Sequence, residues 1–115
     1  MTLFKPQIIH DIPVVKAEEV QAQMGQKFKI VDVRRPEEFT GELGHIEGAQ
    51  LVTLGPDLIK FLEGADKSQE MVFVCRSGGR SGQATALSCE LGFSLTRNMS
   101  GGMLRWNELG FSVVR

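Results

Sequence analysis

Two residue types that often carry chemistry are scarce in this chain of 115 residues, which has only two cysteines and two histidines. Cys75 and Cys89 form neither a disulfide framework nor the Cys-x-x-Cys pair typical of zinc and redox sites. His10 and His45 lie far apart in the sequence. We therefore expect no metal site. We also expect a cytoplasmic protein, because free thiols persist in that compartment.

Long apolar runs and an excess of charge of one sign are also missing. No apolar stretch approaches the about 20 residues that a membrane-spanning helix needs, and residues 1–10 do not resemble a signal peptide. Thirteen Lys and Arg against fourteen Asp and Glu give a net charge of −1. Such a balance offers no general attraction to nucleic acid or to an anionic membrane, so we expect neither as a partner. With 42% hydrophobic residues, the chain can bury the core of one domain.

One cysteine stands in a context that favours a reactive thiolate. Cys75 closes the apolar run 71–74 and opens the segment 75–81, Cys-Arg-Ser-Gly-Gly-Arg-Ser, which a helical pattern follows. A short Gly-rich loop between a strand and a helix directs several backbone N–H groups to one point, and the helix start adds partial positive charge. Arg76 and Arg80 add full charges. These groups stabilise a thiolate, so we expect a lowered pKa and a reactive sulfur.

The rest of the chain alternates short apolar runs with helical patterns, which is typical of β-α-β units and of a mainly parallel sheet. Strands are expected over 8–12, where Pro13 ends the strand, and over 28–33, 50–54, 70–74 and 95–99. Helices are expected over 16–24, 36–39, 56–62, 80–91 and 102–109. Asp32 and Cys75 fall at carboxyl ends of predicted strands, where ligands of such sheets bind.

Four motifs, in this order, resemble those of single-domain rhodanese-like sulfurtransferases. They are Asp32-Val33-Arg34 with Pro36 to Phe39, Gly44 to Ala49, Val72 to Ser81, and Gly101 to Trp106. The likeness runs from about Val15 to Val114. It departs from the family at Glu47, where proline is frequent, and in the slightly long segment 40–43. The resemblance implies a three-layer α/β/α fold with a mainly parallel central sheet. It also implies that residues 1–115 form one domain, with residues 1–13 as an N-terminal extension packed on it.

The resemblance further implies sulfur transfer through a persulfide on Cys75, without a cofactor. The thiolate attacks the outer sulfur of thiosulfate or of a persulfide donor, and cyanide or a thiol then removes that sulfur. A protein is a further option as acceptor. The residues expected to bind the donor and the anionic sulfur are Arg76, Ser77, Gly78, Gly79, Arg80 and Ser81. The glycines allow a tight turn, the N–H groups stabilise charge, and the arginines guide an anionic donor. Ser81 either donates to the sulfur or caps the helix.

Structural roles are favoured for the other polar residues. Asp32 and Arg34 are expected to form a supporting pair beside the site, since buried charges persist only when they are paired. Arg80 is also expected to bridge the loop to an acid such as Asp32 or Glu38. A structural role is expected for His45 and a packing role for Trp106. Packing is the default expectation for Cys89, with a role as a resolving cysteine as the minor option.

Two alternatives to sulfur transfer stay open. Cysteine phosphatases on related folds usually carry Cys-x5-Arg, whereas Cys75 to Arg80 is Cys-x4-Arg, and Val74 stands where phosphatases often have histidine. The shorter loop favours a single sulfur atom over a phosphate group, although arsenate reduction is harder to separate. A binding module without catalysis is the second alternative. Cys75 argues against it, because inactive family members commonly lack the cysteine.

Overall fold

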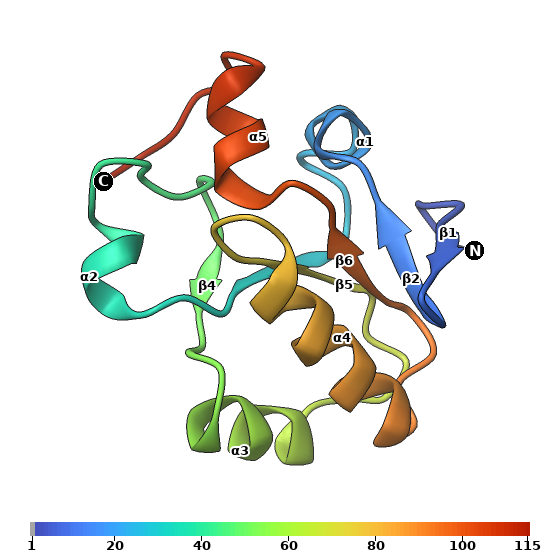
Figure 1. Ribbon diagram of the computed structural model, residues 1–115. Coiled ribbons are helices and arrows are strands. Elements are labelled where there is room, and N and C mark those ends of the chain that lie inside the picture. Colours follow the sequence, from blue (N-terminus) through green and yellow to red (C-terminus); the bar gives the residue numbers. More distant parts are fainter. Residues whose placement is uncertain (1) are drawn as a thin grey trace.

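A computed structural model describes residues 2–115, in which six strands form one sheet in the order β1-β2-β6-β5-β3-β4 (Figure 1). The strands are β1 (Gln7–Ile9), β2 (Ile12–Val15), β3 (Lys29–Asp32), β4 (Gln50–Leu51), β5 (Met71–Val74) and β6 (Thr96–Met99). β1 and β2 pair antiparallel, and the other neighbours pair parallel. The predicted mainly parallel sheet is confirmed.

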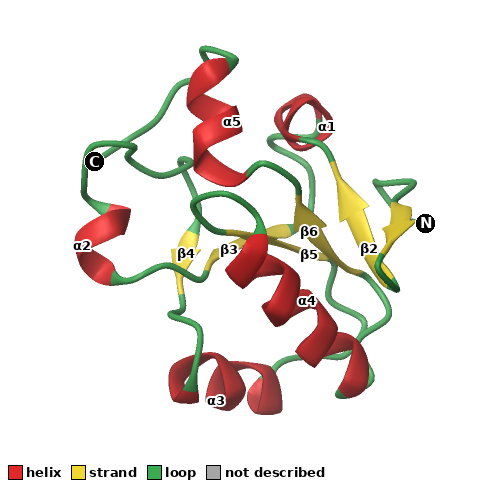
Figure 2. Ribbon diagram, in the orientation of Figure 1, coloured by secondary structure: helices red, strands yellow, loops and turns green. Residues whose placement is uncertain are grey.

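The helices cover both faces of this sheet (Figure 2). They are α1 (Ala17–Ala22), α2 (Pro36–Phe39), α3 (Pro56–Gly64), α4 (Gly79–Glu90) and α5 (Gly102–Glu108). Side chains of β5 alternate between two cores. Val72 and Val74 pack with α1 and α5, whereas Met71 and Phe73 pack with α3 and α4. A strand that is buried on both faces needs a helical layer on each side, so the expected three-layer fold is confirmed.

The expected strand 8–12 is wrong, because a hairpin turn divides it. His10 and Asp11 have φ angles of 51° and 66°, and they join β1 to β2. Positive φ at both central residues is typical of two-residue hairpin turns, whose twist matches that of the paired strands. Pro13 lies within β2, opposite Ile8, and does not end a strand. The expected helix 36–39 is present with these ends, and the other expected elements are present with shifted ends.

The hairpin continues the sheet at β2, which pairs with β6. That residues 1–115 form one domain, with residues 1–13 as its extension, stays a prediction, and Met1 lies outside the described residues. Within residues 2–115, no helix has the length and apolar character needed to cross a bilayer.

Candidate active site

Cys75 follows β5 directly, and its side chain joins the core on the α3 and α4 side of the sheet. The residue is only 1% exposed. The chain then turns through a short loop to Gly78, which has a φ of 111° and precedes the first residue of α4. Glycine adopts such a left-handed conformation without steric cost, so the turn can be tight. The loop therefore places the cysteine sulfur beside the N-terminus of a 12-residue helix.

Two groups donate hydrogen bonds to the sulfur. The N–H of Gly78 lies 3.0 Å from Cys75 Sγ, and the hydroxyl of Ser81 lies 3.2 Å from it. Burial has the largest single effect on the pKa of the Cys75 thiol and raises it. The Ser81 hydroxyl and the N–H groups of Ser81, Gly78 and Ser77 together outweigh burial, so the pKa lies below its ordinary value. The site thus favours the nucleophilic thiolate.

Ser81 does not cap α4, because Gly78 occupies the N-cap position and Ser81 lies inside the helix. Its hydroxyl also lies 2.5 Å from Oδ1 of Asn98, a residue of β6. Asn98 Nδ2 donates to the Gly78 carbonyl at 3.2 Å. Sequence reasoning missed Asn98. Its one signal in the sequence is an amide within an expected buried strand.

Arg80 binds Glu38 of α2 through two hydrogen bonds. Its two terminal nitrogens lie 2.7 and 2.8 Å from the two carboxylate oxygens. The hydrogen bond from Arg80 is the largest influence on the pKa of Glu38, and the pKa falls to about 2. The same bond raises the pKa of Arg80. Of the two acids considered for Arg80, the structure therefore selects Glu38 and not Asp32.

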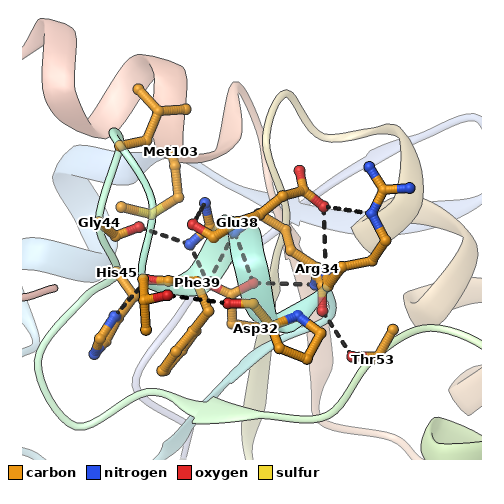
Figure 3. A network of polar contacts seen from close by, with 12 residues as sticks. Asp32, Arg34, Glu38, Phe39, Gly44, His45, Thr53 and Met103 are labelled. Atoms are coloured by element: carbon orange, nitrogen blue, oxygen red, sulfur yellow. Dashed lines mark hydrogen bonds and ion pairs between the residues drawn. The ribbon is translucent and has the colours of Figure 1, made fainter.

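Asp32 and Arg34 form a buried pair, each with only 1% of its side chain exposed. Arg34 Nε and one terminal nitrogen donate to the Asp32 carboxylate at 2.9 and 2.8 Å. The same guanidinium reaches the carbonyls of Gly44 at 2.7 Å and of Glu38 at 3.2 Å (Figure 3). The pair therefore fastens the end of β3 to α2 and to the loop that contains Gly44.

His45 lies in that loop and contacts α2. Its ring stacks on Phe39 with the centroids 3.6 Å apart, and its Nδ1 lies 2.7 Å from the Phe39 carbonyl (Figure 3). Cys89 is exposed near the end of α4, so the packing role expected for it is wrong. Trp106 is buried, and its Nε1 donates to the Ser112 carbonyl at 3.0 Å.

Arg76, the residue after Cys75, is exposed. It lines a cavity of about 360 Å³, together with Arg34, the acidic residues Glu37, Glu38 and Glu42, and the apolar residue Leu104. In the described chain, no carboxylate lies within ion-pair distance of Arg76. Its charge is therefore available to a bound anion.

The first turn of α5 binds the backbone of the Cys75 loop through two hydrogen bonds. Met103 N–H donates to the Cys75 carbonyl at 2.9 Å, and Leu104 N–H donates to the Arg76 carbonyl at 3.0 Å. This close approach requires glycine at position 102. A Cβ atom on Gly102 would lie 2.5 Å from both carbonyl oxygens, and its φ is +54°. Gly102 thus allows α5 to lie this close to the backbone of Cys75 and Arg76.

The loop combines a nucleophilic sulfur with donors for a negative charge beside it. Such a site suits attack by sulfur on an electrophile, followed by stabilisation of an anionic intermediate. Among residues 2–115, no group of three or more His, Cys, Asp or Glu side chains is placed to hold a metal ion.

Comparisons with known proteins find sequences and folds similar to this chain. The family model of the rhodanese-like domain matches residues 16–109. The sulfurtransferase YtwF of Bacillus subtilis is 37% identical over 77% of this chain and 81% of its own length. The adenylyltransferase/sulfurtransferase MoeZ of Mycobacterium tuberculosis is 36% identical over 71% of this chain, which spans only 21% of that protein. A rhodanese-related protein of Thermoplasma volcanium has a similar fold, with a TM-score of 0.78, 23% identity, and coverage of 88% of this chain and 96% of that one.

Proposed function

The chain belongs to the rhodanese-like domain family, and from this premise we propose that it transfers a sulfane sulfur through a persulfide on Cys75. The observation that carries the proposal is the pair of donors at the sulfur. Gly78 N–H and the Ser81 hydroxyl lie 3.0 and 3.2 Å from Cys75 Sγ. The name of the similar protein YtwF as a sulfurtransferase supports the same reaction class.

In the first half-reaction, the Cys75 thiolate attacks the outer sulfur of thiosulfate. The new bond joins Sγ to that sulfur, the sulfur–sulfur bond of thiosulfate breaks, and sulfite leaves with the electron pair. The product is an anionic persulfide on Cys75, so charge is conserved and no cofactor takes part. The N–H groups of the loop from Arg76 to Ser81, aided by the N-terminus of α4, stabilise the charge on the outer sulfur.

In the second half-reaction, a nucleophilic acceptor attacks the outer sulfur. Cyanide becomes thiocyanate, or a thiolate becomes a persulfide, and the Cys75 thiolate returns with the electron pair of the broken bond. A protein thiol close to the loop can serve in the same way as a small thiol. Because the two substrates react in turn at one sulfur, the kinetics follow a ping-pong scheme.

Arg76 and Arg80 have different roles in binding the sulfur donor. Arg80 is held by Glu38 and adds positive charge near the sulfur. Arg76 is exposed and lines the cavity beside the loop. We therefore assign the sulfonate of thiosulfate to Arg76, and the positioning of the loop to Arg80. Asp32 and Arg34 support this arrangement without touching the donor.

The test is the production of thiocyanate from thiosulfate and cyanide. We expect parallel lines in double-reciprocal plots, no turnover by Cys75→Ser, and wild-type turnover by the matched control Cys89→Ser. If the protein produces no thiocyanate from thiosulfate, and none of that product from a persulfide donor, the proposal fails. Hydrolysis of an aryl phosphate through Cys75 under the same conditions would favour the phosphatase alternative.

A further inference from the structure

Asn98 is an amide side chain in the interior of the parallel sheet. It lies on β6 between Val14 of β2 and Phe73 of β5, and it is 8% exposed. Burial of an amide costs free energy unless its donor and its acceptor both find partners. Both do so at the candidate active site. Nδ2 donates to the Gly78 carbonyl at 3.2 Å, and Oδ1 lies 2.5 Å from the Ser81 hydroxyl oxygen.

These partners determine the orientation of the amide. The Gly78 carbonyl only accepts hydrogen bonds, so Nδ2 must face it and Oδ1 must face Ser81. Because Oδ1 cannot donate, the contact with Ser81 is a hydrogen bond only when the hydroxyl proton points to Asn98. The same hydroxyl oxygen lies 3.2 Å from Cys75 Sγ, and it has one proton to give. The amide oxygen and the sulfur therefore compete for one proton.

Each state of the sulfur resolves this competition differently. In the thiol state, the S–H of Cys75 donates to the Ser81 oxygen, and Ser81 donates to Asn98. In the thiolate state, the Ser81 proton turns to Sγ and the amide oxygen loses its partner, which carries a cost for a buried acceptor. In the persulfide state, Sγ is uncharged and the outer sulfur holds the charge. The Ser81 proton then returns to Asn98, and every buried group is again bonded.

We propose that Asn98 is a positioning residue that draws the Ser81 proton away from Cys75. It thereby disfavours the Cys75 thiolate that carries no extra sulfur, relative to the Cys75 persulfide. The inference rests on the proposed sulfur transfer through Cys75. A thiolate that receives less stabilisation from Ser81 is a stronger nucleophile, and loading with sulfur restores the bond to Asn98. The amide therefore favours the sulfur-loaded state without touching the donor.

The charged and titratable groups around this network are few. Arg80 of α4 acts on the thiol through its charge, and Asp32 at the end of β3 acts on Arg80. Arg76 follows Cys75 in the loop. From the hairpin, His10 lines a cavity of about 300 Å³ that Asn98 also lines. All of these groups are present in every variant below, so differences between pH profiles report on the substituted residue.

The experiment measures the pH dependence of alkylation of Cys75 by iodoacetamide, in a Cys89→Ser background that removes the exposed thiol. Asn98→Leu and Asn98→Asp both lose the bond to the Gly78 carbonyl, but only leucine lacks an acceptor for Ser81. For leucine we expect a lower midpoint and roughly three- to tenfold faster alkylation at a pH below the midpoint, the worth of one hydrogen bond. For aspartate we expect a higher midpoint, because a carboxylate binds the Ser81 proton more tightly and repels the thiolate.

Ser81→Ala provides the decisive control. Without the hydroxyl, Asn98→Leu should leave the midpoint of the alkylation profile where Ser81→Ala alone places it. A leucine effect that persists without the hydroxyl, or shifts in the same direction for leucine and aspartate, would overturn the proposal. Circular dichroism checks the fold of each variant, and Asn98→Ala replaces leucine if that side chain does not fit. Alkylation needs no sulfur donor, so these results stand apart from any failure of thiosulfate to load Cys75.

Discussion

At the scale of single residues, Cys75 is subject to two opposing influences. Its side chain is buried, which disfavours a charged sulfur, but the N–H groups and the hydroxyl around it reverse that preference and lower its pKa. A fixed set of donors can stabilise an anion in a site that excludes water without reorganising during the reaction. The backbone N–H groups that favour the thiolate thus also suit the anionic persulfide proposed here.

A first prediction concerns Arg76. Because its guanidinium is exposed and has no carboxylate partner in the described chain, Arg76→Ala should weaken the use of thiosulfate by roughly tenfold in kcat/KM, as expected for one charged contact to an anion. The use of a bulky persulfide donor without a sulfonate should change much less. Steady-state kinetics with both donors check this, with Lys60→Ala on α3 as a control for net charge. Equal losses for the two donors would contradict the role of Arg76 in binding the anion.

The sequence revealed some of these residues and concealed others. Cys75, Gly78 and Arg80 were recognisable because they belong to one short segment whose spacing is informative by itself. Asn98 was not, because its role depends on contact with Ser81, 17 positions away, across the boundary between β6 and α4. The choice of Glu38 over Asp32 as the partner of Arg80 likewise depends on tertiary structure, since the Asp32 carboxylate is already hydrogen-bonded to Arg34.

At the scale of secondary-structure elements, α2 and α5 hold the loop from two directions. α2 contributes Glu38 to the ion pair with Arg80, and α5 donates two N–H groups to the carbonyls of Cys75 and Arg76. Both helices are short, with four and seven residues. Such helices are not stable alone and depend on these tertiary contacts. Changes in either helix should therefore affect the loop.

The ion pair between α2 and α4 predicts a dependence of stability on pH. The pKa of Glu38 falls from 4.5 to about 2 in the folded protein. A lowered carboxyl pKa stabilises the fold at pH values above 4.5, and this contribution is lost as the pH falls toward 2. The contribution is about 3 kcal/mol at most. Glu38→Gln should therefore lower the free energy of unfolding at pH 7 and flatten its dependence on pH in this window.

Urea unfolding at several pH values measures this effect. Glu37→Gln is the matched control in the same helix, because Glu37 is 73% exposed and lies 3.9 Å from Arg35. We expect that control to change the free energy of unfolding by less than about 0.5 kcal/mol. A Glu38→Gln protein that loses stability toward pH 2 as steeply as the wild type would refute the assignment.

The contact of α5 with the loop leads to a prediction about Gly102. A Cβ atom there would meet the carbonyls of Cys75 and Arg76, so Gly102→Ala should destabilise the fold and displace the sulfur. Gly110, just beyond the same helix, also has a positive φ of 76°, but a Cβ atom there would meet nothing within 4 Å. Both variants bear backbone strain of about 1 kcal/mol or more. Only Gly102→Ala should add about 1–3 kcal/mol from the steric clash.

Thermal unfolding and the rate of Cys75 alkylation distinguish the two variants. The Gly110→Ala protein should retain the alkylation profile of the wild type. If Gly102→Ala proves no less stable than Gly110→Ala, and its Cys75 reacts normally, the close approach of α5 does not require glycine at position 102.

The elements themselves were largely predictable from local patterns. Pro36 followed by two acids identified the first turn of α2, and the run before Cys75 identified β5, because both signals are confined to a few residues. The hairpin was missed because His10-Asp11 lacks the glycine that usually marks a turn with positive φ. Its backbone conformation is supported by the pairing of β1 with β2, which the local pattern does not reveal.

At the scale of the whole molecule, the chain before the family match contributes to the core. The rhodanese-like match begins at residue 16, yet Phe4 is only 3% exposed and belongs to the core beneath α1 and α5. Its ring contacts Phe28 edge-on, with the centroids 5.2 Å apart. The N–H of Leu3 donates to the Glu70 carboxylate at 3.1 Å. Leu3 and Phe4 therefore contact residues of the sheet and of its core.

This packing predicts that Phe4→Ala destabilises the protein by about 3 kcal/mol, the usual cost of removing a buried phenyl ring. Ile8→Ala is the control, because Ile8 lies in the same segment but is 66% exposed, and it should be close to neutral. Urea unfolding of the two variants gives the comparison. If Phe4→Ala is as stable as Ile8→Ala, the N-terminal segment does not contribute to the stability of the domain.

The central claim is that Cys75 carries the transferred sulfur, and mass spectrometry of the protein after brief exposure to thiosulfate tests it most directly. We expect the intact mass to rise by one sulfur atom, the addition to map to the peptide that contains Cys75, and cyanide to remove it. The Cys89→Ser protein should gain the same mass, whereas Cys75→Ser should gain none. An unmodified Cys75 after exposure to both thiosulfate and a persulfide donor, or an added sulfur that maps to Cys89, would contradict the account.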